Sequence, residues 1–101
     1  MKNILLVCAA GMSTSLLVNK MKEAAKLEGI EVNINAVPVS ECQKLIDTVD
    51  IVLLGPQVRF QKAQIESYAK RRIPVEVIDM RAYGTMNGKL VLETALKLIN
   101  K

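Results

Sequence analysis

Cys8 is the residue of this chain whose surroundings most clearly favour chemistry. It follows the apolar stretch Ile4 to Val7 and precedes the segment Ala9-Ala10-Gly11-Met12-Ser13-Thr14-Ser15, after which a helical pattern begins. The start of a helix presents unpaired backbone N–H groups and a partial positive charge, and both stabilise an anion. We therefore expect Cys8 to be a nucleophile, with its thiolate or a group carried on its sulfur held by this segment.

The segment after Cys8 contains residue types suited to binding phosphate. Gly11 permits a sharp turn with an open backbone, and residues 13–15 carry hydroxyls, one of which is expected to cap the helix. If Cys8 carries a phosphoryl group, these hydroxyls and the amides of residues 9–15 would hold its oxygens. The alternative is that Cys8 is a small buried hydrophobe. Cys42 lies inside a short amphipathic pattern and is expected to be such a packing residue.

Four other polar residues are candidates for the same site, and each has a simpler alternative. Gln57 follows Gly55-Pro56, and its amide could hydrogen-bond a bound anion, although a Gly-Pro pair is often a plain strand stop. Asp79 ends another apolar stretch, where it is either a proton donor or the cap of the next turn. Arg59 and Arg81 either lie near the site and attract phosphate or are simply solvated.

The elements that position these residues follow from an alternation of short apolar stretches and helical patterns. The pattern predicts strands at 2–7, 30–37, 51–54 and 75–78, and helices at 13–28, 40–48, 60–72 and 88–100. We expect one α/β domain over residues 1–101, a three-layer α/β/α sandwich with a four-stranded parallel sheet and right-handed crossovers. Within it, strand 30–37 has the alternation of an edge strand, and strand 51–54 is apolar throughout, as central strands are.

Two local expectations follow from this arrangement. Cys8, Gln57 and Asp79 each come after a predicted strand, and the carboxyl ends of parallel strands share the edge where ligands bind, so these residues should lie along one edge. Ser40 and Gln43 match a capping box at the start of the second helix.

Composition excludes several classes of function. The chain has no histidine and two isolated cysteines, so we expect no metal and no cofactor. One Phe, two Tyr and no Trp leave little to stack on bases, so nucleic-acid binding is not expected despite the net charge of +4. No apolar run reaches the roughly 18 residues of a membrane span. The apolar stretch 4–7 is too short for a signal peptide, so we expect a cytoplasmic protein with reduced cysteines and no direct membrane insertion.

Three motifs together resemble a known family over essentially the whole chain. They are the segments from Cys8 to Leu17, from Val52 to Gln57 and from Pro74 to Asp79. They look like the enzyme IIB component, lactose/cellobiose type, of the bacterial phosphoenolpyruvate-dependent sugar phosphotransferase system.

The resemblance implies that Cys8 is phosphorylated in transit. The phosphoryl group would come from a phosphohistidine on a IIA partner. A IIC membrane partner would hold this chain at the inner face of the membrane and present the sugar that receives the group. It further implies a sugar of the β-linked disaccharide class, such as cellobiose, lactose or chitobiose.

Two other classes of thiol enzyme share parts of this pattern. Low-molecular-weight phosphatases, and arsenate-reductase-like enzymes with them, resemble the Cys8 loop, but the phosphatases carry an arginine six positions after the cysteine. Here that position is Thr14, and residues 8–18 contain no cation to stabilise the transferring group. A thioredoxin-like redox role would need a resolving cysteine at position 11, which is glycine. The sequence therefore favours a phosphoryl carrier over a hydrolase or a redox enzyme.

Overall fold

The computed structural model of the chain describes residues 2–8, 12–70 and 72–99, and of residues 12–14 the backbone alone. Its four strands are β1 (Lys2–Cys8), β2 (Val32–Pro38), β3 (Ile51–Leu54) and β4 (Val75–Val77). All three pairings are parallel, and the sheet order is β2-β1-β3-β4. This confirms the predicted α/β class and sheet, with strand 30–37 at an edge and strand 51–54 in the interior.

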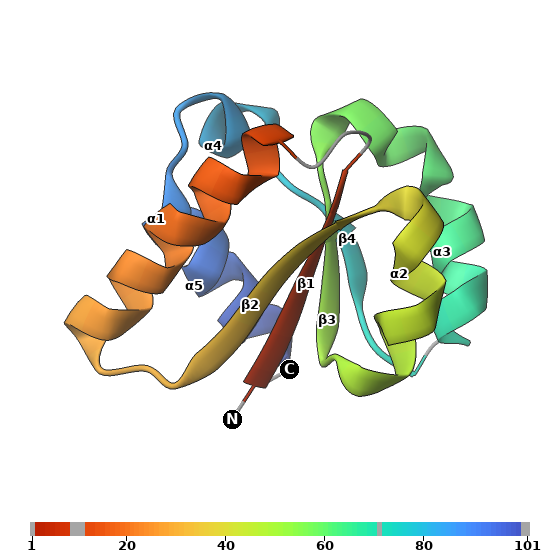
Figure 1. The fold of residues 1–101 in the computed structure, drawn as a ribbon, viewed down its shortest axis with the longest axis horizontal. Coiled ribbons are helices and arrows are strands. Elements are labelled where there is room, and N and C mark those ends of the chain that lie inside the picture. Colours follow the sequence, from red (N-terminus) through yellow and green to blue (C-terminus); the bar gives the residue numbers. More distant parts are fainter. Residues whose placement is uncertain (1, 9–11, 71, 100–101) are drawn as a thin grey trace.

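Helices cover both faces of the sheet, which makes the predicted three-layer sandwich (Figure 1). One layer holds α1 (Met12–Glu28), α4 (Met80–Gly84) and α5 (Gly88–Ile99). The opposite layer holds α2 (Val39–Leu45) and α3 (Lys62–Ala69), together with two 3-10 helices, η1 (Ile46–Thr48) and η2 (Pro56–Gln61). None of the helices in the described part of the chain is long and apolar enough to cross a membrane.

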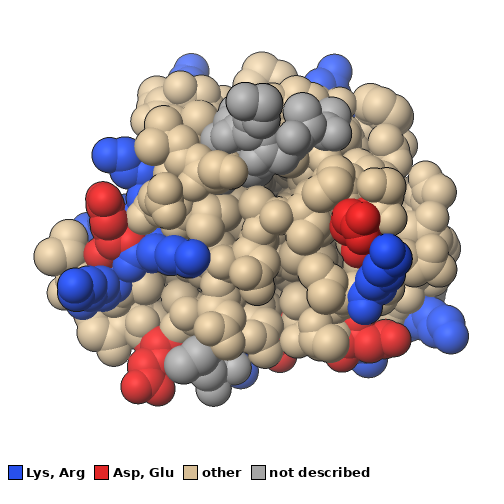
Figure 2. Space-filling model, viewed as in Figure 1, with Lys and Arg blue, Asp and Glu red and all other residues tan. Residues whose placement is uncertain are grey.

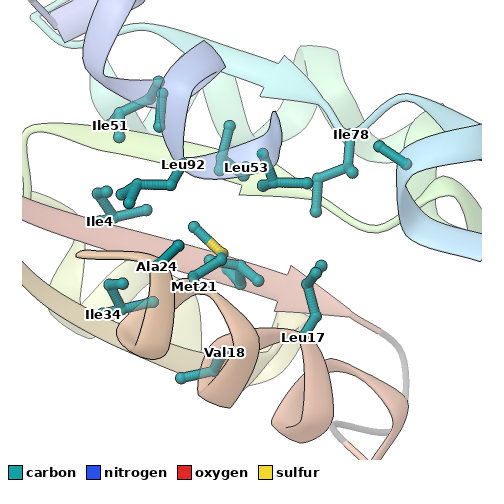
Figure 3. Close-up of a cluster of buried hydrophobic side chains, with 14 of the residues drawn as sticks. Ile4, Leu17, Val18, Met21, Ala24, Ile34, Ile51, Leu53, Ile78 and Leu92 are labelled. Carbon is teal, nitrogen blue, oxygen red and sulfur yellow. The ribbon is translucent and has the colours of Figure 1, made fainter. Parts of the chain in front are cut away.

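Strand β1 shows how the core is divided between the two layers. Ile4 and Leu6 are buried in the cluster under α1 and α5, where Leu17, Met21 and Leu92 meet them (Figure 3). The alternate residues of β1, Leu5 and Val7, are buried in the second cluster under α2 and α3. Because a parallel sheet is covered on both faces, its central strands are apolar at every position rather than at alternate ones.

The structure corrects two of the predicted helices and adds one that was not predicted. The predicted helix 60–72 is split, since η2 occupies 56–61 and α3 ends at Ala69, where Lys70 adopts a left-handed conformation with φ of 53°. The capping box of Ser40 and Gln43 is wrong because α2 begins at Val39, with Pro38 at the N-cap position and no side-chain cap. The unpredicted helix is α4, which follows β4 directly.

Gly88 lets α5 lie close against the backbone of α1, and we predict that Gly88→Ala destabilises the fold. A Cβ at this position would lie 2.5 Å from the carbonyl carbon of Lys20 and 2.6 Å from the backbone nitrogen of Met21. These are backbone atoms, so the two helices must separate, at an expected cost of about 1–3 kcal/mol in the free energy of unfolding measured in urea.

Gly84→Ala is the matched control, because a Cβ at Gly84 would meet nothing within 4 Å. This second variant should be unchanged or up to about 1 kcal/mol more stable, since alanine favours a helix over glycine. Equal stability of the two variants would contradict the proposed contact.

Candidate functional site

The carboxyl ends of the strands bring the predicted site residues to one edge of the sheet. Cys8 is the last residue of β1 and lies opposite Pro38 of β2. On its other side, the N–H of Gly55 donates to the carbonyl of Val7 at 2.8 Å, which extends the pairing of β1 and β3 by one residue and places Gly55 beside Cys8. Asp79 follows β4 at the same edge.

Cys8 points toward the layer that contains α1. Alternation along β1 puts it on the same face as Ile4 and Leu6, which pack under α1. Three residues separate the end of β1 from Met12, where α1 begins. The side chain is 2 % exposed, and the thiol is not part of a disulfide. The sulfur therefore stands between the end of a central strand and the start of a helix.

The loop predicted to bind phosphate is described only in part. Ala9, Ala10 and Gly11 lie outside the described residues, so their role stays a prediction. The backbone of residues 12–14 already belongs to α1, and Ser15 is exposed in the same turn. The helix begins at Met12, so all three hydroxyl residues lie within its first turn rather than before it, and the capping expected of one of them stays a prediction. The backbone N–H groups of residues 12–14 are among those that a helix start leaves without intrahelical partners.

Cys42 lies in the opposite layer of the sandwich, on α2. Its side chain is 0 % exposed and belongs to the cluster under α2 and α3, whereas Cys8 belongs to neither cluster among the described residues. Burial raises the pKa of the Cys42 thiol, against a smaller lowering by a backbone hydrogen bond. A buried thiol of this kind is a poor nucleophile at neutral pH. The prediction that Cys42 is a packing residue is confirmed.

Gln57 is brought close to Cys8, although the two are far apart in sequence. It lies in η2, directly after the end of β3, and is exposed. A Cβ at Gly55 would lie 2.8 Å from Oε1 of Gln57 and 3.6 Å from Cβ of Cys8. The carboxamide of Gln57 and Cβ of Cys8 therefore border the same space above Gly55.

The remaining charged candidates make local contacts at this edge. Oδ2 of Asp79 accepts hydrogen bonds from the N–H of Arg81 at 3.1 Å and of Ala82 at 3.0 Å. It thus caps α4, which is one of the two roles expected from the sequence. Nη1 of Arg59 donates to the carbonyl of Pro56 at 3.0 Å, so this guanidinium is held against its own turn. Arg81 is exposed at the start of α4.

Three exposed apolar side chains near this edge were not recognised in the sequence. They are Leu16 in α1, Phe60 in η2 and Met80 in α4, at 50 %, 77 % and 66 % exposure, and we call them the apolar rim. Each belongs to a segment that begins at the carboxyl edge of the sheet. In Figure 2 the charged side chains lie mostly along the left, lower and right margins of this face, with two basic side chains at its upper corners, and the described surface between them is largely uncharged. Exposed apolar groups that gather at one edge of a protein are typical of a surface that contacts a partner.

Comparison with known proteins places this arrangement among phosphotransferase components. A family model described as PTS system, lactose/cellobiose-specific IIB subunit, matches residues 3–94. The chain is 49 % identical to the oligo-beta-mannoside-specific EIIB component of Bacillus subtilis, with 98 % of this chain and 97 % of that protein covered. It is 42 % identical, with the same coverage, to the galactose-specific EIIB component of Lactococcus lactis. The solution structure of a cellobiose-specific IIB component from Borrelia burgdorferi is 45 % identical and superposes with a TM-score of 0.82, over 98 % of this chain and 92 % of that one.

A low-molecular-weight protein tyrosine phosphatase from Bacillus subtilis shares the fold but little of the sequence. Its solution structure superposes with a TM-score of 0.66, covering 97 % of each chain, at 16 % identity. A likeness at this level concerns the fold alone. The distinction between a carrier and a phosphatase therefore depends on the residues of the site.

Proposed function

Because this chain belongs to the lactose/cellobiose-specific IIB subunit family of the phosphotransferase system, we propose that it carries a phosphoryl group on Cys8. The group comes from a phosphohistidine of a IIA protein and passes to a sugar presented by the IIC membrane component. The observation that carries the proposal is the place of Cys8 at the carboxyl edge of the sheet beside the start of α1. Cys42, the other thiol of the chain, is enclosed in the core.

The two transfers are substitutions at phosphorus. In the first, the sulfur of Cys8 forms a bond to phosphorus while the bond from phosphorus to the histidine nitrogen breaks. That nitrogen keeps the electron pair and takes up the thiol proton. In the second, a sugar hydroxyl oxygen forms the new bond, and the sulfur leaves as a thiolate that recovers the hydroxyl proton. Such transfers need positioning and charge stabilisation more than further covalent chemistry.

The phosphoryl oxygens are held, in this proposal, by the segment from Ala9 to Ser15. The start of α1 at Met12 supports this role of the segment. It places backbone N–H groups and the positive end of the helix dipole shortly after Cys8 in the sequence. The amide of Gln57 supplies a further donor from the other side of the site. Asp79 keeps its capping role and takes no part in proton transfer.

Both partners have to reach the same sulfur, so they must use the same surface in turn. The apolar rim of Leu16, Phe60 and Met80 offers that surface, with Arg59 and Arg81 able to attract a phosphorylated partner. The carrier would act in the cytoplasm, at the inner face of the membrane where IIC is embedded.

The sugar is a β-linked disaccharide of the cellobiose, lactose or chitobiose type. Similarity to components named for oligo-beta-mannoside and cellobiose supports this class, and the galactose-specific relative supports a galactose-containing sugar such as lactose within it. The contacts that choose among these sugars are expected to lie in IIC. A low-molecular-weight phosphatase or arsenate-reductase-like activity is the weaker alternative, because position 14 is threonine where the phosphatases have arginine.

Reconstituting the relay tests the proposal. We predict that radiolabelled phosphate moves from phosphorylated IIA to this chain, and from this chain to the sugar only when IIC-containing membranes are added. Mass spectrometry of the intermediate should assign the phosphoryl group to the peptide with Cys8. Label that remains on IIA, or that reaches the sugar with this chain omitted, would contradict the proposed function.

A further inference from the structure

The missing side chain of Gly55 leaves a space shared by Cys8 and Gln57. A Cβ there would lie 2.8 Å from Oε1 of Gln57, closer than non-bonded atoms approach. The same Cβ would lie 3.6 Å from Cβ of Cys8 and 3.6 Å from the carbonyl oxygen of Val7, both ordinary van der Waals distances. Among these neighbours, the carboxamide of Gln57 is the one group that a side chain at this position would displace.

The backbone at Gly55 does not itself require glycine. Its φ of −60° and ψ of 147° lie in the extended region that all residues adopt, as expected for a residue before a proline. Its N–H donates to Val7 and its carbonyl accepts from Val58 at 3.0 Å, and alanine would keep both bonds. Alanine at this position should therefore leave the fold and the backbone unchanged. What glycine provides here is room.

We propose that Gly55 is a positioning residue for phosphoryl transfer, because its missing side chain lets the carboxamide of Gln57 lie beside Cys8. This inference rests on the proposed function, in which the sulfur carries the phosphoryl group. The atom of Gln57 that lies above Gly55 is Oε1, an acceptor, and rotation of this exposed carboxamide brings its Nε2, with two N–H donors, to the same place. Hydrogen bonds from such donors to a charged oxygen are strong. With Gly55 replaced, the Gln57 amide turns away to solvent, and the phosphoryl group loses that donor while the loop and α1 remain.

A double-mutant cycle measures this coupling directly. The variants are Gly55→Ala, Gln57→Ala and the double variant, and the measured quantity is the rate constant of phosphoryl transfer from phosphorylated IIA to this chain. Gly55→Ala and Gln57→Ala should each lower the rate about tenfold, as expected for the loss of one hydrogen bond to a charged group. The double variant should be no slower than either single variant, because both remove the same contact.

Two further readouts separate positioning from a structural effect. The thermal midpoint of Gly55→Ala and its affinity for IIA should match those of the wild type. In the wild type, phosphorylation should shift the side-chain N–H resonances of Gln57, and this shift should be lost in Gly55→Ala. Gln57→Asn shortens an exposed side chain by one methylene and keeps the carboxamide. It should lower the transfer rate as Gly55→Ala does, and it tests the same contact if Gly55→Ala folds poorly.

The outcomes distinguish a failure of the positioning role of Gly55 from a failure of the proposed carrier function. If the wild type is labelled on Cys8 and Gly55→Ala is labelled at the same rate, the positioning role is wrong while the carrier function stands. The positioning role would also be wrong if the double variant lowered the transfer rate by the product of the two single effects, because Gly55 would then act independently of Gln57. If Cys8→Ser is labelled as fast as the wild type, the proposed function itself fails.

Discussion

Cys8→Ser is expected to abolish phosphoryl acceptance from IIA while leaving the protein folded. Serine is close to cysteine in size, so at this buried position the substitution removes little packing. The serine hydroxyl is a far weaker nucleophile than a thiol at neutral pH. We expect the labelling rate to fall by roughly a thousandfold or more, as when an essential nucleophile is removed from an enzyme.

Cys42→Ala provides the matched control, because it removes the other thiol of the chain from a fully buried position. It should accept phosphate at the wild-type rate, although the small cavity should cost about 1 kcal/mol of stability. Circular dichroism and urea unfolding of both variants confirm that labelling is compared between folded proteins. Labelling that survives in Cys8→Ser and disappears in Cys42→Ala would reverse the assignment of the phosphorylated residue.

The fold was predictable because its strands are short and apolar and its helices follow them in strict alternation. Strand 51–54 has the predicted bounds, because its four apolar residues stand between Asp50 and Gly55, and both of those residue types disfavour a strand. The predicted helix 60–72 is wrong at its start, because Gly55-Pro56 does more than end the strand. Proline is also favoured at the first position of a helix, and Pro56 begins η2 here.

The site was predictable as far as its location and less so in its detail. Parallel strands bring Cys8, Gln57 and Asp79 to one edge, and that follows from topology alone. The space above Gly55 that Gln57 and Cys8 border depends on a missing side chain, and periodicity in the sequence gives no information about such a space. The apolar rim was missed for a related reason. Leu16 and Leu17 are adjacent and chemically identical, yet one is half exposed and the other is buried.

The wild-type protein is expected to hydrolyse aryl phosphates negligibly, which separates a carrier from a phosphatase of the same fold. A carrier must keep its phosphocysteine until the next partner arrives, so slow attack by water is part of its function. Residues 8–18 contain no cation that would stabilise the charge on a phosphoryl group during attack by water. The isolated phosphocysteine should therefore persist in buffer and discharge rapidly when IIC and sugar are added.

Thr14→Arg is the variant that tests this reasoning, because it places a guanidinium six positions after Cys8, where the phosphatases have theirs. A bidentate pair between the guanidinium and the phosphoryl oxygens should shorten the lifetime of the phosphocysteine in buffer. The lifetime is measured by the release of labelled phosphate, with Thr14→Gln as a control of similar bulk without the charge. Hydrolysis of aryl phosphates by the wild type at about 1 s⁻¹ or faster, a rate typical of enzymes, would make this chain a phosphatase rather than a carrier.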